Sequence, residues 1–117
     1  MIFDAADKSL TIDQGATFSL AINFETSDEE TLDLTSASAA MQGRTAFDAA
    51  STIFSLTEVS GITLSDTNPN ITIIISAATT AAFTAPQTGV YDLEITLAGA
   101  THRILSGPLF ISPEVTK

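Results

Sequence analysis

Apolar and polar residues alternate with a period of two along much of this chain. The clearest case spans 18–24, where large apolar side chains alternate with Ser, Ala and Asn. A second case spans 89–97, where the odd positions from Tyr91 onward are apolar and the even positions from Asp92 onward are polar. Because successive side chains of a strand point to opposite faces, both segments predict strands with one buried and one wet face.

Shorter apolar runs predict the other strands, and polar turn clusters separate them. Ser76 is placed to cap one short helical turn over 77–82, with Phe83 anchoring that turn in the core. Proline cannot donate to a strand ladder, so Gly107-Pro108 predicts an edge or a bulge in the last strand. Together with the two clear cases, seven to eight strands are expected, the others lying near 10–12, 39–44, 53–56, 61–64, 71–75 and 101–111.

Many short strands without a helical repeat predict an all-β fold of two packed antiparallel sheets, an immunoglobulin-like sandwich. Tyr91 follows a glycine near the start of the penultimate strand. In such sandwiches this is the place of a tyrosine corner, whose hydroxyl bonds to upstream backbone; an ordinary amphipathic strand is the alternative. A chain of 117 residues predicts one domain over 1–117, with short terminal arms.

Charge excludes some classes of partner, and cysteine content excludes some kinds of site. Fourteen acidic residues against four basic ones give a net charge of −10. Such a chain repels phosphate backbones and anionic lipid, so neither nucleic acid nor a membrane surface is an expected partner. The absence of cysteine excludes disulfides and thiolate metal sites. The first residues have no secretory signal pattern, and no apolar run is long enough to span a membrane.

Candidate catalytic chemistry is sparse. The lone histidine, His102, lies beside Arg103 on an expected hairpin, which is typical of a solvated side chain. Asp92 and Glu94 share a strand face about 7 Å apart, as in the carboxylate pair of an inverting glycosidase. Acids on the wet face of a strand are routine, however, and a sugar site usually needs more aromatic residues. We therefore expect no enzyme activity and no cofactor.

Two further patterns have a functional and an ordinary interpretation. The acidic segment 25–33 could hold calcium through carboxylate and carbonyl oxygens, but it lacks the spacing of a calcium-binding loop, which favours a solvated loop. Asn70-Ile71-Thr72 matches the glycosylation triplet, which has no meaning without a secretory signal.

Several apolar residues are out of phase with the strand pattern. They are either covered on both faces, or rephased by the expected bulge, or they form a contact with another protein. As a hypothesis, the contact involves the terminal segments 1–3 and 107–115. The candidate interface residues are Ile2, Phe3, Ile74, Phe110 and Val115.

The order of these motifs resembles a known family. The opening Leu-Thr-Ile-Asp-Gln-Gly-Ala-Thr-Phe-Ser-Leu at 10–20 leads, through 32–35, 39–44, 61–64 and 71–76, to Gly-Val-Tyr-Asp-Leu-Glu-Ile at 89–95. The ending is Gly-Pro-Leu-Phe-Ile-Ser-Pro-Glu-Val-Thr at 107–116. Over about residues 8–116 the chain is similar to the small immunoglobulin-like virion proteins of tailed bacteriophages, including the N-terminal domain of upper baseplate proteins.

The resemblance implies a non-enzymatic structural protein of the virion, made in the host cytoplasm. It implies a role as an adaptor in the tail or baseplate that binds other virion proteins, and a homo-oligomer, of which a trimer is one form. A cement protein on the capsid and a carbohydrate-binding host-recognition module are the alternatives. Gly43 stands where the family has a larger apolar residue, which predicts looser packing there or a closer partner. Baseplate members continue past the equivalent of Lys117, which favours a stand-alone adaptor or cement protein over a fibre carrier.

Overall fold

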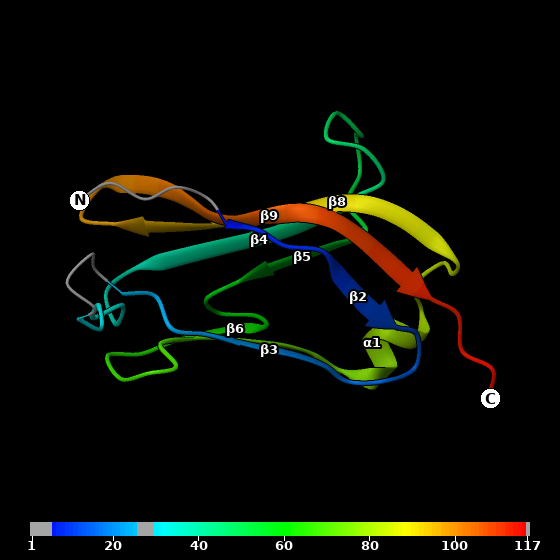
Figure 1. Cartoon of the computed structure of the whole chain (residues 1–117), viewed down its shortest axis with the longest axis horizontal. Helices are drawn as coiled ribbons and strands as arrows, with labels where there is room; N and C mark the ends of the chain where they lie inside the picture. The colour runs from blue at the N-terminus through cyan, green and yellow to red at the C-terminus, as the bar shows by residue number, and fades with distance from the viewer. Residues whose placement is uncertain (1–5, 26–29, 117) are drawn as a thin grey trace.

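The computed structural model describes residues 6–25 and 30–116. Two sheets pack face to face (Figure 1). The six-stranded sheet has the order β1-β9-β8-β4-β5, with β2 also paired to β9. Its strands are β1 (Ala6–Asp7), β2 (Leu10–Asp13), β4 (Ser38–Arg44), β5 (Phe54–Thr57), β8 (Gln87–Leu97) and β9 (Ala100–Ser112). The three-stranded sheet has the order β3-β7-β6, made of β3 (Phe18–Ile22), β7 (Ile71–Ile75) and β6 (Ile62–Leu64).

The predicted all-β, immunoglobulin-like sandwich is confirmed, with one difference in strand direction. Strands β5, β4, β8 and β9 pair antiparallel, as do β3, β7 and β6. In contrast, β1 and β2 both pair parallel to β9. After β2 the chain turns at 14–16 and enters the other sheet as β3, so the partner of β2 comes from the far end of the chain. A parallel pair needs such a long connection. The additional strand, β1, has two residues, too few to show alternation.

The core lies between the sheets and follows the predicted alternation. In β8 the odd positions Tyr91, Leu93 and Ile95 are buried and the even positions face water. In β7 the residues Ile71 and Ile73 are fully buried. Burying each such side chain stabilises the fold by roughly 1.5–3 kcal/mol relative to leaving it exposed. The alternation is therefore the main determinant of which way each strand faces.

The short helix forms where the sequence predicts it. Helix α1 spans Ala77–Ala81, and the Ser76 hydroxyl accepts a hydrogen bond from the Thr79 amide at 3.2 Å. Thr80 is fully buried, and its hydroxyl accepts from the Gly15 amide. The helix is thereby fastened to the turn between β2 and β3. Phe83 follows the helix and stacks on Phe54 with ring centroids 6.3 Å apart, which confirms its place beside the core.

The predictions at two glycine positions are only partly correct, because Gly107-Pro108 lies at a local edge of β9 but is not a bulge. The extra residue in β9 is not at Gly107-Pro108, because the register shift falls opposite Leu93 and Glu94, between Arg103 and Leu105. The ladder with β8 continues through Pro108, while the parallel partners of β9 are interrupted there, β1 ending before it and β2 starting after it.

Gly43, the second of these positions, is tightly packed and not loose. A Cβ at this residue would lie 2.6 Å from the Phe54 ring and 3.0 Å from Leu109. The Phe54 ring therefore takes the space that a larger side chain would need, and no outside partner is required to explain the glycine.

Candidate functional site

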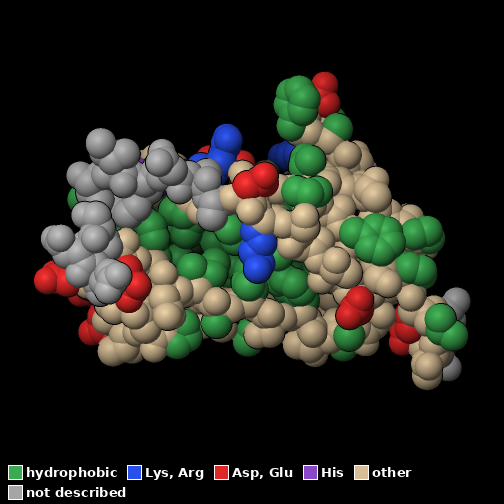
Figure 2. Space-filling model, in the orientation of Figure 1, with side chains coloured by type: hydrophobic (Ala, Val, Ile, Leu, Met, Phe, Trp, Pro, Cys, Tyr) green, Lys and Arg blue, Asp and Glu red, His purple; other side chains and the backbone are tan. Residues whose placement is uncertain are grey.

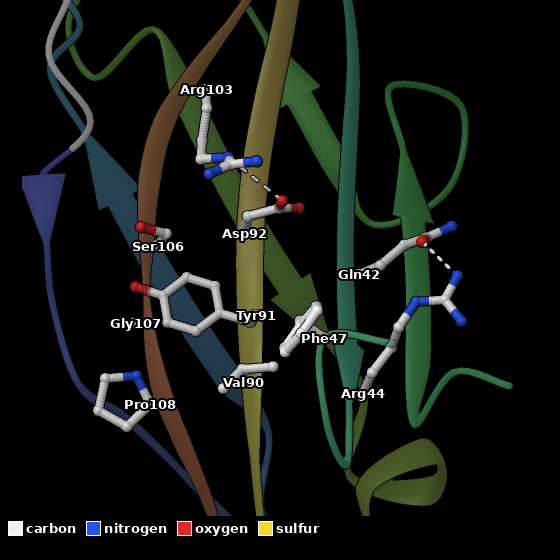
Figure 3. A pocket seen from close by; sticks show the side chains of 10 residues that line it. All are labelled: Gln42, Arg44, Phe47, Val90, Tyr91, Asp92, Arg103, Ser106, Gly107 and Pro108. Carbon is white, nitrogen blue, oxygen red and sulfur yellow. Dashed lines mark hydrogen bonds and ion pairs between the residues drawn. The ribbon is translucent and has the colours of Figure 1, made fainter. Parts of the chain in front are cut away.

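A groove of about 500 Å³ lies on the outer face of the six-stranded sheet (Figure 3). Strands β4, β8 and β9 form its floor, and the connection between β4 and β5 rises beside it. Its lining residues are Gln42, Arg44, Phe47, Val90, Tyr91, Asp92, Arg103, Ser106, Gly107 and Pro108. We call this site the outer-face groove.

Strand register places the floor residues in two rows across the sheet. Val90 of β8 lies between Arg44 of β4 and Pro108 of β9. In the next row on the same face, Asp92 lies between Gln42 and Ser106. The first row is largely apolar and the second is polar. A ligand on this floor would therefore meet an apolar strip beside a strip of hydrogen-bonding groups.

Phe47 lies above the apolar row. Its segment leaves the sheet after β4 and projects from the body of the protein (Figure 1). The Arg44 guanidinium holds the base of this loop, donating to the Ala49 carbonyl at 2.8 Å and to Gln42 Oε1 at 3.0 Å. The loop keeps the Phe47 side chain 88% exposed, with Val90 beside it (Figure 3). Phe47, Val90 and Pro108 together form an exposed apolar patch, which is typical of a contact surface.

The groove also concentrates positive charge in an acidic protein. Two of the four basic residues of the chain, Arg44 and Arg103, line it. Arg103 Nε lies 3.4 Å from Asp92 Oδ2, and both side chains are substantially exposed. Because the Arg103 side chain is 58% exposed, its guanidinium is accessible to a second acceptor. The exposed ion pair itself contributes little to stability.

Tyr91 lies behind the groove and its role is structural. Its hydroxyl donates to the Lys8 carbonyl at 2.8 Å. Burial, and to a smaller extent the negative charge of Asp7, raise the pKa of Tyr91 to about 12. The prediction of a tyrosine corner is correct in that the hydroxyl bonds to upstream backbone. The acceptor lies between β1 and β2, 83 residues upstream, whereas a tyrosine corner bonds only a few residues upstream, so the contact itself is not a tyrosine corner.

The residues predicted as an interface do not converge on one site. Phe110 is exposed on the same sheet face as the groove, one cross-strand row beyond Pro108. Ile74 is exposed on the outer face of the other sheet, so β7 is covered on one face only. Val115 is exposed beyond the end of β9. Ile2 and Phe3 lie outside the described residues.

Sequence reasoning missed the two apolar residues that define the groove. Val90 is the single apolar residue among the even positions of β8 from Thr88 to Thr96, so it carried the same out-of-phase signal as Ile74. Phe47 had a weaker signal, an aromatic residue between small and polar neighbours in an expected loop.

The other candidate residues either take part in contacts within the fold or do not come together in a site. Asn70 is fully buried, and its side-chain amide donates to the Phe24 carbonyl. The glycosylation triplet that it begins is therefore not accessible. Asp92 is paired with Arg103, and Glu94 lies opposite Arg103 in the β8–β9 register. Within 6–25 and 30–116, no group of three or more His, Asp or Glu residues could hold a metal ion, and no helix is long and apolar enough to cross a membrane. Positions 26–29 of the acidic segment lie outside the described residues.

Comparisons with known proteins address the fold only. No protein-family model matches the sequence, and no curated protein matches it. Among solved structures, Tim-1 is similar to this chain with a TM-score of 0.48 and 12% identity, over 97% of this chain and 99% of that chain. A likeness this weak carries no argument about function. The strand pairing itself defines the class of protein, an all-β immunoglobulin-like sandwich.

Proposed function

We propose that this protein is a non-enzymatic structural component of a bacteriophage virion, acting as an adaptor in the tail or baseplate by binding other virion proteins. The virion setting is supported by the sequence resemblance over about residues 8–116. The binding role is supported by one structural observation. Phe47 is 88% exposed above a groove floored by Val90 and Pro108.

The energetics of this site favour a protein partner. Burying an exposed phenylalanine contributes roughly 1.5–3 kcal/mol. Aromatic and arginine side chains are the commonest energetic centres of protein interfaces. The groove offers both types, Phe47 above the apolar row and Arg103 beside the polar row. An extended segment with an apolar side chain next to a carboxylate would satisfy both rows at once.

A complementation experiment tests the proposal. A phage that lacks the gene is supplied with wild-type protein, with Phe47→Ser, or with Val59→Ser. Val59 is the matched control, because it is also 88% exposed but lies in the turn between β5 and β6, outside the groove. Heads and tails are purified separately, and the protein in each is quantified by mass spectrometry. We expect wild type and Val59→Ser in the tail fraction, and at least a tenfold loss for Phe47→Ser.

Each other outcome has a defined meaning. Equal incorporation of the Phe47 variant would exclude the groove as the contact. Wild-type protein found in heads alone would replace the tail adaptor with a capsid cement protein. Its absence from both fractions would overturn the virion assignment.

A further inference from the structure

Strand β3 is an edge strand with an open side. It pairs with β7 on one side, and none of the described strands pairs with it on the other. Such an edge presents a row of backbone N–H and C=O groups that can pair with a strand from another chain. Natural proteins usually protect such edges with charged side chains, proline or a bulge. The β3 sequence Phe-Ser-Leu-Ala-Ile has neither charge nor proline, and its register with β7 is unbroken.

Hydrogen bonding in β7 identifies the free groups. The Ile74 amide donates to the Gly61 carbonyl at 2.9 Å, so residue 74 directs its backbone groups toward the β6 side. Backbone groups alternate along a strand, so those of Ile73 and Ile75 point toward β3, where they meet Leu20 and Phe18. The backbone groups of the intervening residues of β3, Ser19 and Ala21, therefore point away from the sheet.

The inner side chains of β3 are also incompletely covered. Phe18, Leu20 and Ile22 face the core but are only half-buried, whereas their partners in β7 are at most 2% exposed. Figure 2 shows hydrophobic side chains in a hollow between the two layers, above the course of β3 in Figure 1. A further strand at this edge would pair the free backbone groups and cover these side chains together.

We propose that the occupant is a second copy of β3, which forms a two-fold dimer with a continuous six-stranded sheet across the interface. An antiparallel copy centred on Leu20 places Ser19 opposite Ala21 of the partner subunit, so both residues exchange hydrogen bonds. The pattern of large and small residues reads the same in both directions, as an isologous contact requires. Leu20 then meets its own copy, and Phe18 meets Ile22 of the partner subunit.

Charge favours this edge over the other surfaces for self-association. The protein carries −10 and its copies repel one another over most of their surface. Residues 14–24 contain no charged side chain. In the proposed register Glu25 lies opposite Gly15 of the partner subunit and not opposite another acid. This contact is independent of the outer-face groove, which lies on the other sheet.

Single cysteines in this cysteine-free chain test both the contact and its register. In the proposed pairing the two copies of residue 20 face each other as a non-hydrogen-bonded pair, with Cα atoms about 4.5 Å apart, within disulfide range. Residue 22 is the matched control on the same strand and face, because its two copies are four positions apart, roughly 13 Å. We expect oxidised Leu20→Cys to form a covalent dimer and Ile22→Cys to stay mostly unlinked.

Light scattering over a range of concentrations supplies the second measurement. Wild type should reach twice the chain mass of 12.2 kDa. Ala21→Pro should be monomeric yet folded by circular dichroism, because the lost N–H points away from β7. Ser19→Lys, which places a charge in the contact and keeps the backbone, serves if the proline variant does not fold. A monomeric wild type, a trimer, or a dimer whose Leu20→Cys variant does not cross-link would each overturn the proposal.

Discussion

Two loops of this protein differ in whether their residues bond within the fold or face water. The loop between β6 and β7 closes on itself, since Ser65 donates from its amide to the Asn70 carbonyl and from its hydroxyl to the Thr67 carbonyl. The loop between β4 and β5 is held at its base by Arg44 and by the Ile53 amide, which donates to the Gly43 carbonyl, and it presents Phe47 to water. The first loop contributes to stability, and the second leaves an apolar surface that the fold itself does not use. Substitutions in the two regions should therefore separate stability from binding.

The largest effect on stability is expected at Asn70. Its fully buried amide accepts from the Phe24 amide at 2.8 Å and donates to the carbonyls of Phe24 and Leu32 at 2.8 and 2.9 Å. Asn70→Ala leaves these groups without partners and should lower the free energy of unfolding by about 3 kcal/mol, measured by urea denaturation. The control is Asn68→Ala, which removes an exposed hydrogen bond to Glu25 and should cost under about 0.5 kcal/mol. Similar losses for both variants would contradict the comparison.

An intermediate effect is expected at Tyr91. Tyr91→Phe removes the hydrogen bond to the Lys8 carbonyl and should cost about 1 kcal/mol at neutral pH. The folded-state pKa of about 12 lies above the ordinary value of 10, so the stabilisation is complete below pH 10. Between pH 10 and 12 the unfolded chain releases the phenol proton while the folded chain retains it, so the free energy of unfolding of the wild type falls by roughly 1 kcal/mol per pH unit. Thermal melts from pH 9 to 12 should show a smaller decline for Tyr91→Phe, and parallel curves would exclude this linkage.

The smallest effect is expected in the outer-face groove. Asp92→Asn removes an exposed ion pair of 3.4 Å with Arg103. The free energy of unfolding should change by under about 0.5 kcal/mol, and by less still in high salt. Denaturation of Phe47→Ser should show an equally small change. A loss of about 2 kcal/mol from either substitution would mean that this surface is part of the fold and not a free contact face.

Local patterns were enough to predict most of the strands, because each buries one face along its own length. The capped helix after Ser76 was predictable for a similar reason, since its signals lie within a few residues. Parallel pairing of β2 with β9 was not, because it joins Leu10 to Leu109 and leaves no local signal. Asn70 looked like an ordinary turn residue for the same reason, its partners Leu32 and Phe24 being 38 and 46 residues away.

The candidate site was predictable only in part. The phase of Phe110 and Ile74 in their strands singled them out but left open whether they are covered or exposed, and in the structure both are exposed. Phe110 and Ile74 lie on different sheets because of the order of the strands. The alternation of residues along a single strand does not determine that order. The position of Phe47 above the groove depends on the course of a loop whose sequence has no periodic pattern.

The parallel pairing of β2 with β9 has a mechanical consequence. The first of these strands lies near the start of the chain and the second near its end, and their hydrogen bonds join Leu10–Asp13 to residues 109–112. Tension between the two ends would pull the strands past each other lengthwise, so their hydrogen bonds would be loaded together and not opened one after another. A module fastened by both ends would therefore resist stretching at this seam, and Tyr91, bonded to the segment just before β2, would share the load.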